Sequence, residues 1–288
     1  MAGTVLVIGA TGRTGSELIR LLVAKGIPVR AATRTPGTIA SRWGRDVEAA
    51  MFDFDRPETF APSVHGVERI FLMARPADNH SDRAAIPLVE EARKDGVRQI
   101  VNLTAMGAEQ DEAFALRVLE RHIEASGIPF THLRPNWFMQ NFDSGPFMAD
   151  IQSSGALHLP AADAKLSFID VRDIAAVGQA TLTDPVHLCR AYSLTGGEAL
   201  DHATAMSIIS RAAERTLTYV PISEEAACAG LARAGIPADR IERWRVFFGK
   251  VRAGRCAPVS PAVEEILGRA PIRFEEYARD YAAVWQRP

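Results

Sequence analysis

A glycine-rich turn near the start of the chain constrains its fold more than any other feature. The turn reads Gly9-Ala10-Thr11-Gly12-Arg13-Thr14-Gly15; it follows the apolar run 4–8 and precedes the amphipathic stretch 16–25. The first glycine permits a tight turn, the second lets phosphates approach the backbone, and the third lets a helix pack closely on the strand. Amide groups at the start of that helix then face an anion. The order of strand, turn and helix predicts a dinucleotide site that uses Gly9, Thr11, Gly12, Arg13, Thr14 and Gly15.

The end of the second expected strand predicts which dinucleotide binds. An acidic side chain there would bind the ribose 2′-hydroxyl of NAD(H), but residues 29–34 contain no carboxylate. Arg34 is placed to bind a 2′-phosphate, and Arg13 can meet that phosphate from the other side. The alternative is that Arg34 is a solvated residue at the start of the loop 35–37. The pattern favours NADP(H) over NAD(H).

Apolar strands alternate with helical stretches through the first half of the chain, which predicts an α/β fold with a doubly wound parallel sheet (Rossmann type). The expected strands are 4–8, 29–33, 47–52, 69–73, 98–103 and 130–134, and the expected helices are 16–25, 84–94 and 113–125. After Pro135 the alternation weakens, with further strands expected at 166–169, 191–194 and 218–222 and a helix at 202–214. We therefore expect an NADP(H)-binding domain over 1–155, to which residues 166–195 return. A smaller, mostly helical substrate-binding lobe would occupy 196–288.

Composition limits the partners of the chain. The 288 residues carry a formal net charge of −2, without a long lysine and arginine block, which argues against nucleic-acid binding. No stretch suggests a membrane span or a leader, and the three cysteines show no paired spacing, so a cytoplasmic location is expected. The seven histidines show no metal-ligand spacing, and no metal is expected. The expected partner is a small-molecule substrate, for a monomer or a homodimer.

Residues that directly follow the strands are candidates for the site, because ligands of open parallel sheets bind outside the carboxyl ends of the strands. Asp53 can accept from an adenine amino group and Phe54 can pack on the base, although Phe54 is equally well explained as a core residue. Ala74 and Arg75 would run beside the cofactor ribose. Thr104 would bond the nicotinamide ribose or a polar substrate atom, or it simply ends its strand.

The loop after the sixth expected strand provides candidates for substrate binding. Its aromatic side chains would form an apolar wall and its asparagines would hold polar atoms, although the same residues could be core and turn formers. The predicted pocket residues are Met106, Trp137, Phe138, Asn141 and Phe142. The candidates for catalytic roles are Thr104, Asn136 and Trp137.

Six segments together resemble a known family. They are the glycine turn 9–15, Arg34, Phe52-Asp53-Phe54-Asp55, and the stretches 133–142, 168–175 and 192–200. Through these segments the chain resembles the NmrA-like, atypical branch of the short-chain dehydrogenase/reductases. Within that branch it looks closest to the ergot-alkaloid-type reductases, the festuclavine and agroclavine dehydrogenases. It is also similar to triphenylmethane, azo-dye and quinone reductases. The resemblance implies NADPH-dependent reduction of an electron-poor organic molecule, held between the sheet edge and the C-terminal lobe.

One departure from the wider superfamily selects among reactions. The usual tyrosine and lysine, four residues apart, are missing from the helix expected at 113–125. Ketone reduction needs a proton as the alkoxide forms, whereas an iminium ion, a cationic dye or a quinone accepts hydride without a simultaneous acid. His122 is another candidate donor, or a surface residue near a helix end. The alternatives are an NADP(H)-sensing regulator without catalysis and a redox-neutral isomerase or cyclase.

Overall fold

The computed structural model describes residues 3–75 and 78–286. Contacts divide the chain into two compact units, and each unit consists of two segments. The first unit contains Met1–Pro135 and Val171–Leu194, and the second contains Asn136–Asp170 and Thr195–Pro288. Residues 136–155 thus group with the second unit, although they were expected in the first domain.

A seven-stranded parallel sheet forms the centre of the first unit, with the order β3-β2-β1-β4-β5-β6-β8. Its strands are β1 Val5–Ile8, β2 Val29–Thr33, β3 Val47–Met51, β4 Arg69–Met73, β5 Gln99–Leu103, β6 Phe130–Pro135 and β8 Arg190–Leu194. Val5 pairs with Val29 on one side and with Arg69 on the other, so the strand order reverses beside β1. The fold class predicted from the sequence is confirmed. Its ligand site is expected at this reversal point, outside the carboxyl ends of the strands.

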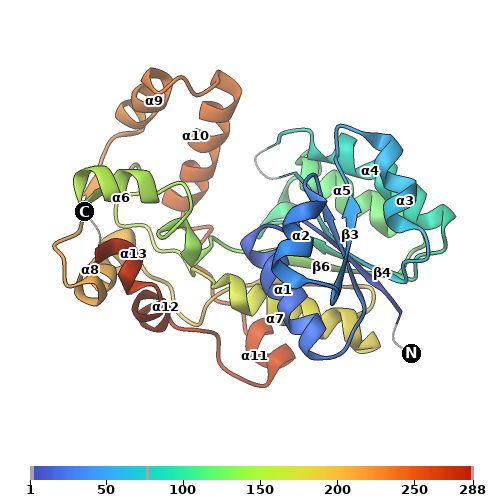
Figure 1. The fold of residues 1–288 in the computed structure, drawn as a ribbon. Coiled ribbons are helices and arrows are strands. Elements are labelled where there is room, and N and C mark those ends of the chain that lie inside the picture. Colours follow the sequence, from blue (N-terminus) through green and yellow to red (C-terminus); the bar gives the residue numbers. More distant parts are fainter. Residues whose placement is uncertain (1–2, 76–77, 287–288) are drawn as a thin grey trace. The chain divides into compact units, whose positions relative to one another are not determined.

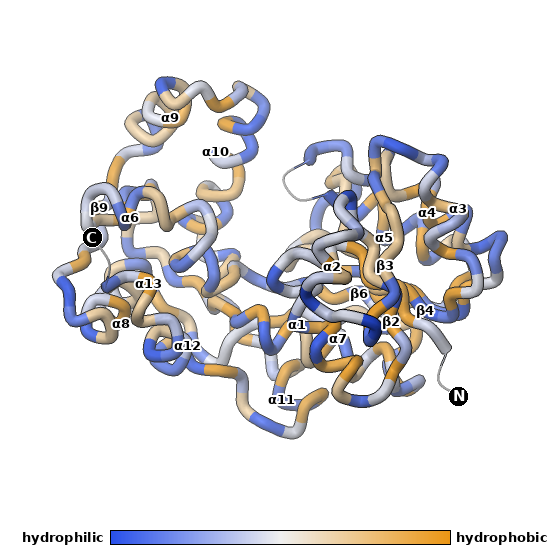
Figure 2. The backbone as a smooth tube through the Cα atoms, in the orientation of Figure 1, coloured by the Kyte–Doolittle hydropathy of each residue, from blue (hydrophilic) through white to orange (hydrophobic). Residues whose placement is uncertain are grey.

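Helices cover both faces of this sheet (Figure 1). They are α1 Arg13–Ala24, α2 Pro36–Trp43, α3 Phe60–Val64, α4 Ser81–Lys94, α5 Ala115–Ala125 and α7 Val171–Thr183. Neighbouring strand residues point to opposite faces: Leu72 packs with Leu88 of α4 and Leu119 of α5. Phe71 faces the other way, where a Cβ on Gly178 of α7 would lie 3.1 Å from its ring. Since both faces are covered, the strands are largely apolar (Figure 2).

The helix boundaries differ from the sequence prediction at two places near the glycine turn. Helix α1 begins at Arg13 rather than at Ser16, because the glycine motif itself supplies the first helical turn. A loop was expected at residues 35–37, but Pro36 and Gly37 are the first two residues of helix α2, and no helix had been predicted there. Proline is compatible with the first turn of a helix, and Ile39 then buries its side chain on the unit.

The second unit is mainly helical and contains a small two-stranded sheet. Strand β7 Ala156–Leu159 pairs in parallel with β9 Thr218–Pro221. The strand expected at 166–169 is not a strand, because its backbone forms only the isolated bridges Phe138↔Ile169 and Leu166↔Leu200. The helices of this unit are α6 Met148–Ser154, α8 His202–Ala213, α9 Glu224–Arg233, α10 Ala238–Arg252, α11 Ala262–Leu267, α12 Phe274–Asp280 and α13 Ala282–Gln286.

Candidate functional site

A cavity of about 710 Å³ lies in the first unit, at the carboxyl ends of β1, β2, β3 and β4. This is the reversal point of the sheet, and its volume is in the range of small-molecule and cofactor sites. The residues that line it are Ile8, Gly9, Thr11, Gly12, Ala32, Thr33, Arg34, Thr35, Phe52, Asp53, Phe54, Asp55, Met73 and Arg75. Most of the cofactor-binding residues expected from the sequence therefore meet around one cavity.

The glycine turn forms the floor of this cavity. Gly9 has φ 79°, a left-handed conformation that favours glycine. Its carbonyl accepts a hydrogen bond from the backbone N–H of Gly12 at 3.0 Å. Gly12 is the N-cap of α1, which has neither a side-chain cap nor an acidic residue in its first turn. The N-terminus of α1 therefore carries no negative side chain that would compete with an anion for the positive end of the helix dipole.

Arg34 lies at the rim of the cavity, directly after β2. Its side chain is exposed, and no acidic group among the described residues pairs with it. Arg75 lines the same cavity but forms an ion pair with Asp55 at 2.8 Å, and that hydrogen bond raises the pKa of Arg75 above its ordinary value. Arg34 is thus the cavity arginine whose guanidinium is open to a phosphate.

Asp53 and Phe54 form the wall after β3. The Asp53 carboxylate accepts from the backbone N–H of Asp55 at 3.1 Å, and its own N–H donates to Thr59. The Phe54 ring is half-buried and meets Phe52 edge-on, with ring centroids 4.9 Å apart. Phe54 therefore packs on the core with one side and lines the cavity with another. A role in the core and a role in packing on the adenine base are thus compatible.

Six residues predicted to bind the cofactor or to donate a proton do not line the cavity, among them Thr104, which follows β5. Thr14, Gly15 and Ala74 are buried beside it, and Arg13 is the exposed first residue of α1. His122 of α5 lies 2.8 Å from Glu90 of α4, in the helical layer, so its ring is already paired with a carboxylate.

Thr104 directly follows β5 and is buried. Its hydroxyl donates to Glu120 of α5 at 2.8 Å, and its backbone N–H donates to the Leu133 carbonyl at 2.8 Å. Glu120 is fully buried and also accepts from Arg117 and Arg134. Burial opposes ionisation of Glu120, but hydrogen bonds from Arg134 and Thr104 hold its pKa below the ordinary value.

Glu120 was not among the residues predicted from the sequence, although the helix pattern contained a signal. In α5, Leu116 and Leu119 face the apolar core, and Glu120 lies four residues after Leu116 on the same side. A carboxylate at such a position requires a cation, and Arg134, at the end of β6, supplies it. The partner becomes visible only when the strand and the helix are packed together.

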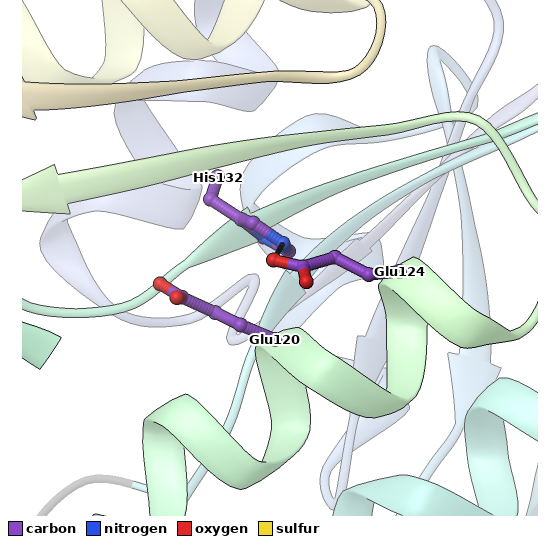
Figure 3. A group of neighbouring side chains, drawn as sticks. All are labelled: Glu120, Glu124 and His132. Carbon is purple, nitrogen blue, oxygen red and sulfur yellow. Dashed lines mark ion pairs between the residues drawn. The ribbon is translucent and has the colours of Figure 1, made fainter. Parts of the chain in front are cut away.

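Glu120 and Glu124 extend from α5 toward His132 of β6 (Figure 3), and the potential ligand atoms of the three residues lie within 4.8 Å of one another. Arg117 donates to both carboxylates, and Arg134 forms a two-point contact with Glu120. These guanidinium groups supply the positive charge that a metal ion would otherwise provide, so the chemistry of the cluster does not fit a cation. Burial lowers the pKa of His132 to about 4.

The loop predicted to bind the substrate belongs to the second unit. Asn136 is buried, and its amide donates to Ser167 at 2.7 Å and to the Cys256 carbonyl at 2.8 Å. Trp137 is half-buried, with its ring 6.1 Å from Phe147 and 5.4 Å from Phe248. Asn136 thus ties three segments of the unit together, and Trp137 leaves part of its surface exposed.

The remaining predicted pocket residues differ in exposure. Phe142 is fully buried among the aromatic rings of the second unit, and its carbonyl accepts from Trp285 Nε1 at 2.8 Å. Phe138 and Asn141 are partly exposed residues of the same unit. Met106 is partly exposed in the first unit, where its backbone N–H donates to the Pro135 carbonyl at 2.9 Å.

The fold and the cavity define the class: a dinucleotide-binding protein of the doubly wound α/β type. The NmrA-like family model matches residues 1–278, so the chain belongs to the NmrA-like family. It is 32% identical to the NAD(P)H azoreductase of Xenophilus azovorans over 98% of this chain and 99% of that protein. It is 27% identical to the agroclavine dehydrogenase of Claviceps fusiformis, over 98% of each chain.

A solved structure agrees with this assignment of the fold. The triphenylmethane reductase of Citrobacter sp., complexed with NADP(H), superposes with a TM-score of 0.83 and 22% identity, over 96% of this chain and 99% of that one. The resemblance stated from the sequence is confirmed, and the named relatives confirm the expectation of an NAD(P)H-dependent oxidoreductase. No helix in the described part of the chain combines the length and the apolar character needed to cross a membrane.

Proposed function

We propose that this protein is an NADPH-dependent reductase that transfers hydride to a C=N bond or to a conjugated aromatic or quinone acceptor. The observation that carries the proposal is the cavity at the reversal point, with a glycine turn as its floor and Arg34 at its rim. When bound there, NADPH supplies the hydride. The residues of the chain bind and orient the dinucleotide.

The preference for NADPH rests on charge at the end of β2. Strand β2 ends in Thr33 and is followed by Arg34, so no carboxylate is present to bind a ribose 2′-hydroxyl. An unpaired guanidinium gains more from a 2′-phosphate than from a hydroxyl, because charge-assisted bonds are the stronger ones. The NADP(H) named with the Citrobacter structure is consistent with this preference.

The class of acceptor rests on helix α5. This helix contains neither tyrosine nor lysine, and Glu120, on its buried side, is an ionised partner of two arginines. His122 of the same helix is paired with Glu90 of α4, so we infer that α5 supplies no acid for an alkoxide. An iminium, dye or quinone acceptor needs none at the moment of transfer, and the azoreductase and agroclavine dehydrogenase relatives bear names that fit such acceptors.

We propose that the substrate contacts Trp137 and Phe138, whose partly exposed rings provide apolar surface on the second unit. Asn136 would act indirectly, since its amide already bonds Ser167 and the Cys256 carbonyl. The fully buried Phe142 would support this surface from beneath.

A panel of acceptors tests the proposal. Purified protein is mixed with NADPH or NADH and an azo dye, a triarylmethane dye, a quinone or a cyclic iminium ion, and coenzyme absorbance is followed. We expect acceptor-dependent oxidation that is faster with NADPH. Tight NADPH binding without oxidation by any acceptor would instead indicate a dinucleotide sensor, and product formation without net NADPH consumption would indicate a redox-neutral isomerase or cyclase.

A further inference from the structure

The Glu120 carboxylate is saturated by hydrogen-bond donors inside the first unit. It accepts from Thr104 Oγ1 at 2.8 Å, from Arg134 Nε at 2.9 Å and Nη2 at 2.7 Å, and from Arg117 Nη1 at 2.9 Å. No part of the Glu120 side chain is exposed. Two guanidinium groups keep this carboxylate ionised, and an ionised carboxylate can only accept hydrogen bonds.

The direction of the bond to Thr104 follows from this. A hydroxyl has one hydrogen and two lone pairs. The Thr104 hydroxyl lies 2.8 Å from the Glu120 carboxylate and 3.4 Å from the Leu133 carbonyl oxygen, so its hydrogen points to the closer and charged acceptor. The Thr104 backbone is also fixed, because its N–H donates to the Leu133 carbonyl at 2.8 Å. The hydrogen of Thr104 Oγ1 is therefore already used, and only the lone pairs of this oxygen can bond a ligand. Toward a ligand, Thr104 Oγ1 is a hydrogen-bond acceptor.

The position of Thr104 indicates which half of a dinucleotide would reach it. In the sheet order β3-β2-β1-β4-β5-β6-β8, Arg34 and Phe54 follow strands on one side of β1. Thr104 follows β5, on the opposite side of β1. A dinucleotide lies across the reversal point with its pyrophosphate at the β1 turn. With the adenosine half over β2 and β3, the nicotinamide half extends over β4 and β5.

We propose that Glu120 is a positioning residue that makes Thr104 a hydrogen-bond acceptor, so that Thr104 selects an N–H or O–H group of the nicotinamide half of the coenzyme. The carboxamide N–H and the ribose hydroxyls of that half are groups of this kind. This inference rests on the proposed function. In this arrangement Thr104 is not a proton donor to the substrate, because its hydroxyl hydrogen is bonded to the Glu120 carboxylate.

Binding of two ligands separates this role from a purely structural one. NADPH contains the nicotinamide half, whereas 2′,5′-ADP contains only the adenosine half with its 2′-phosphate. Thr104→Val keeps the shape of the side chain but removes the acceptor. We expect it to weaken NADPH binding about five- to tenfold, the range for one hydrogen bond, and to leave 2′,5′-ADP binding unchanged.

Glu120→Gln tests the positioning directly. The amide of the glutamine can donate a hydrogen bond to Thr104, which turns the hydroxyl hydrogen toward the ligand. The Thr104 hydroxyl and the N–H or O–H group of the coenzyme would then both be donors, and no hydrogen bond could form between them. We expect NADPH binding to weaken at least as much as in Thr104→Val, and no further loss when the two changes are combined. Glu112→Gln is the matched control, because Glu112 contacts Arg117 and Arg121 but not Thr104. It should bind NADPH like the wild type.

The outcomes distinguish the two proposals. If the wild type binds neither NADPH nor 2′,5′-ADP, the proposed function fails. If the wild type binds both but Thr104→Val binds NADPH equally well, or if the losses of Thr104→Val and Glu120→Gln add in the double variant, the positioning role alone is wrong. If Glu120→Gln does not fold, Thr104→Val is compared with Thr104→Ser, which keeps the hydroxyl. Equal NADPH binding by these two variants would show that the Thr104 hydroxyl does not bond the coenzyme and would overturn the proposal.

Discussion

Gly15 in the first turn of α1 lies against the peptide group of Gly9: a Cβ on Gly15 would overlap the Gly9 carbonyl oxygen and come 2.8 Å from the carbonyl carbon. Nothing larger than hydrogen fits there without moving α1 away from the end of β1. The anion site depends on this packing, because the amides that face the cavity belong to the first turn of the same helix. The third glycine therefore determines where the first turn of α1 lies.

Gly15→Ala should weaken NADPH binding at least tenfold, because the helix must shift to remove the overlap. Titration of intrinsic fluorescence or calorimetry with NADPH measures the effect. Gly249→Ala in α10 is the control, since a Cβ there would meet no atom within 4 Å. Equal NADPH affinities of Gly15→Ala and Gly249→Ala would contradict the role assigned to the glycine turn.

Arg34→Ala should raise the KM for NADPH by about 10- to 100-fold, the range for one charge-assisted bond, and change the KM for NADH little. The reason is that only NADPH carries the 2′-phosphate that we assign to Arg34. Arg20→Ala, at an exposed arginine of α1 paired with Glu17, controls for loss of positive charge. Equal effects of Arg34→Ala on the two coenzymes would overturn the assignment.

Asn136→Ala should lower the free energy of unfolding by about 1–3 kcal/mol, because the Ser167 hydroxyl and the Cys256 carbonyl both lose their amide donor. NADPH affinity should remain near that of the wild type, since the cavity residues belong to the first unit. Urea denaturation and NADPH titration measure the two quantities. A variant with wild-type stability but lost turnover would show that Asn136 acts on the substrate directly.

The stability of the second unit should fall in mild acid because of His202. Burial among aromatic rings lowers the pKa of this histidine to about 4, below the ordinary 6.5. The unfolded chain therefore binds a proton near pH 6.5, whereas the folded chain binds it only near pH 4, and stability decreases as pH falls through this window. The slope for one group is at most about 1.4 kcal/mol per pH unit.

His202→Phe retains an aromatic ring and removes the titrating group. Urea midpoints measured between pH 7 and pH 4 should therefore fall less steeply for this variant than for the wild type. Parallel curves would show that His202 does not contribute to acid sensitivity.

Much of the first unit was predictable because its signals are local. The glycine turn, the apolar strands and the missing carboxylate after β2 are each contained in a short window. Helix α2 was missed because Thr35-Pro36-Gly37 has the composition of a turn as well as that of a helix start. The choice between these depends on Ile39, which is buried by the rest of the unit.

The structural features that could not be predicted from the sequence depend on residues far apart in the chain. Strand β7 has only four residues, and its partner β9 lies about sixty residues later in the chain, so periodicity gives little signal. Thr104 was recognised as a candidate from its place after β5. Its bond to Glu120, which fixes the direction of its hydrogen, required the packing of α5 on the sheet.

Deuterium transfer tests the central claim most directly. NADPH deuterated at C4, in each of its two stereochemical forms, is incubated with the protein and with a triarylmethane dye or a cyclic iminium ion. Mass spectrometry then measures the deuterium content of the reduced product. A reductase of this class should place one deuterium on the product carbon from one of the two forms only, because a bound coenzyme presents one face. A product without deuterium from either form, or no reduced product from any such acceptor, would contradict hydride transfer by this protein.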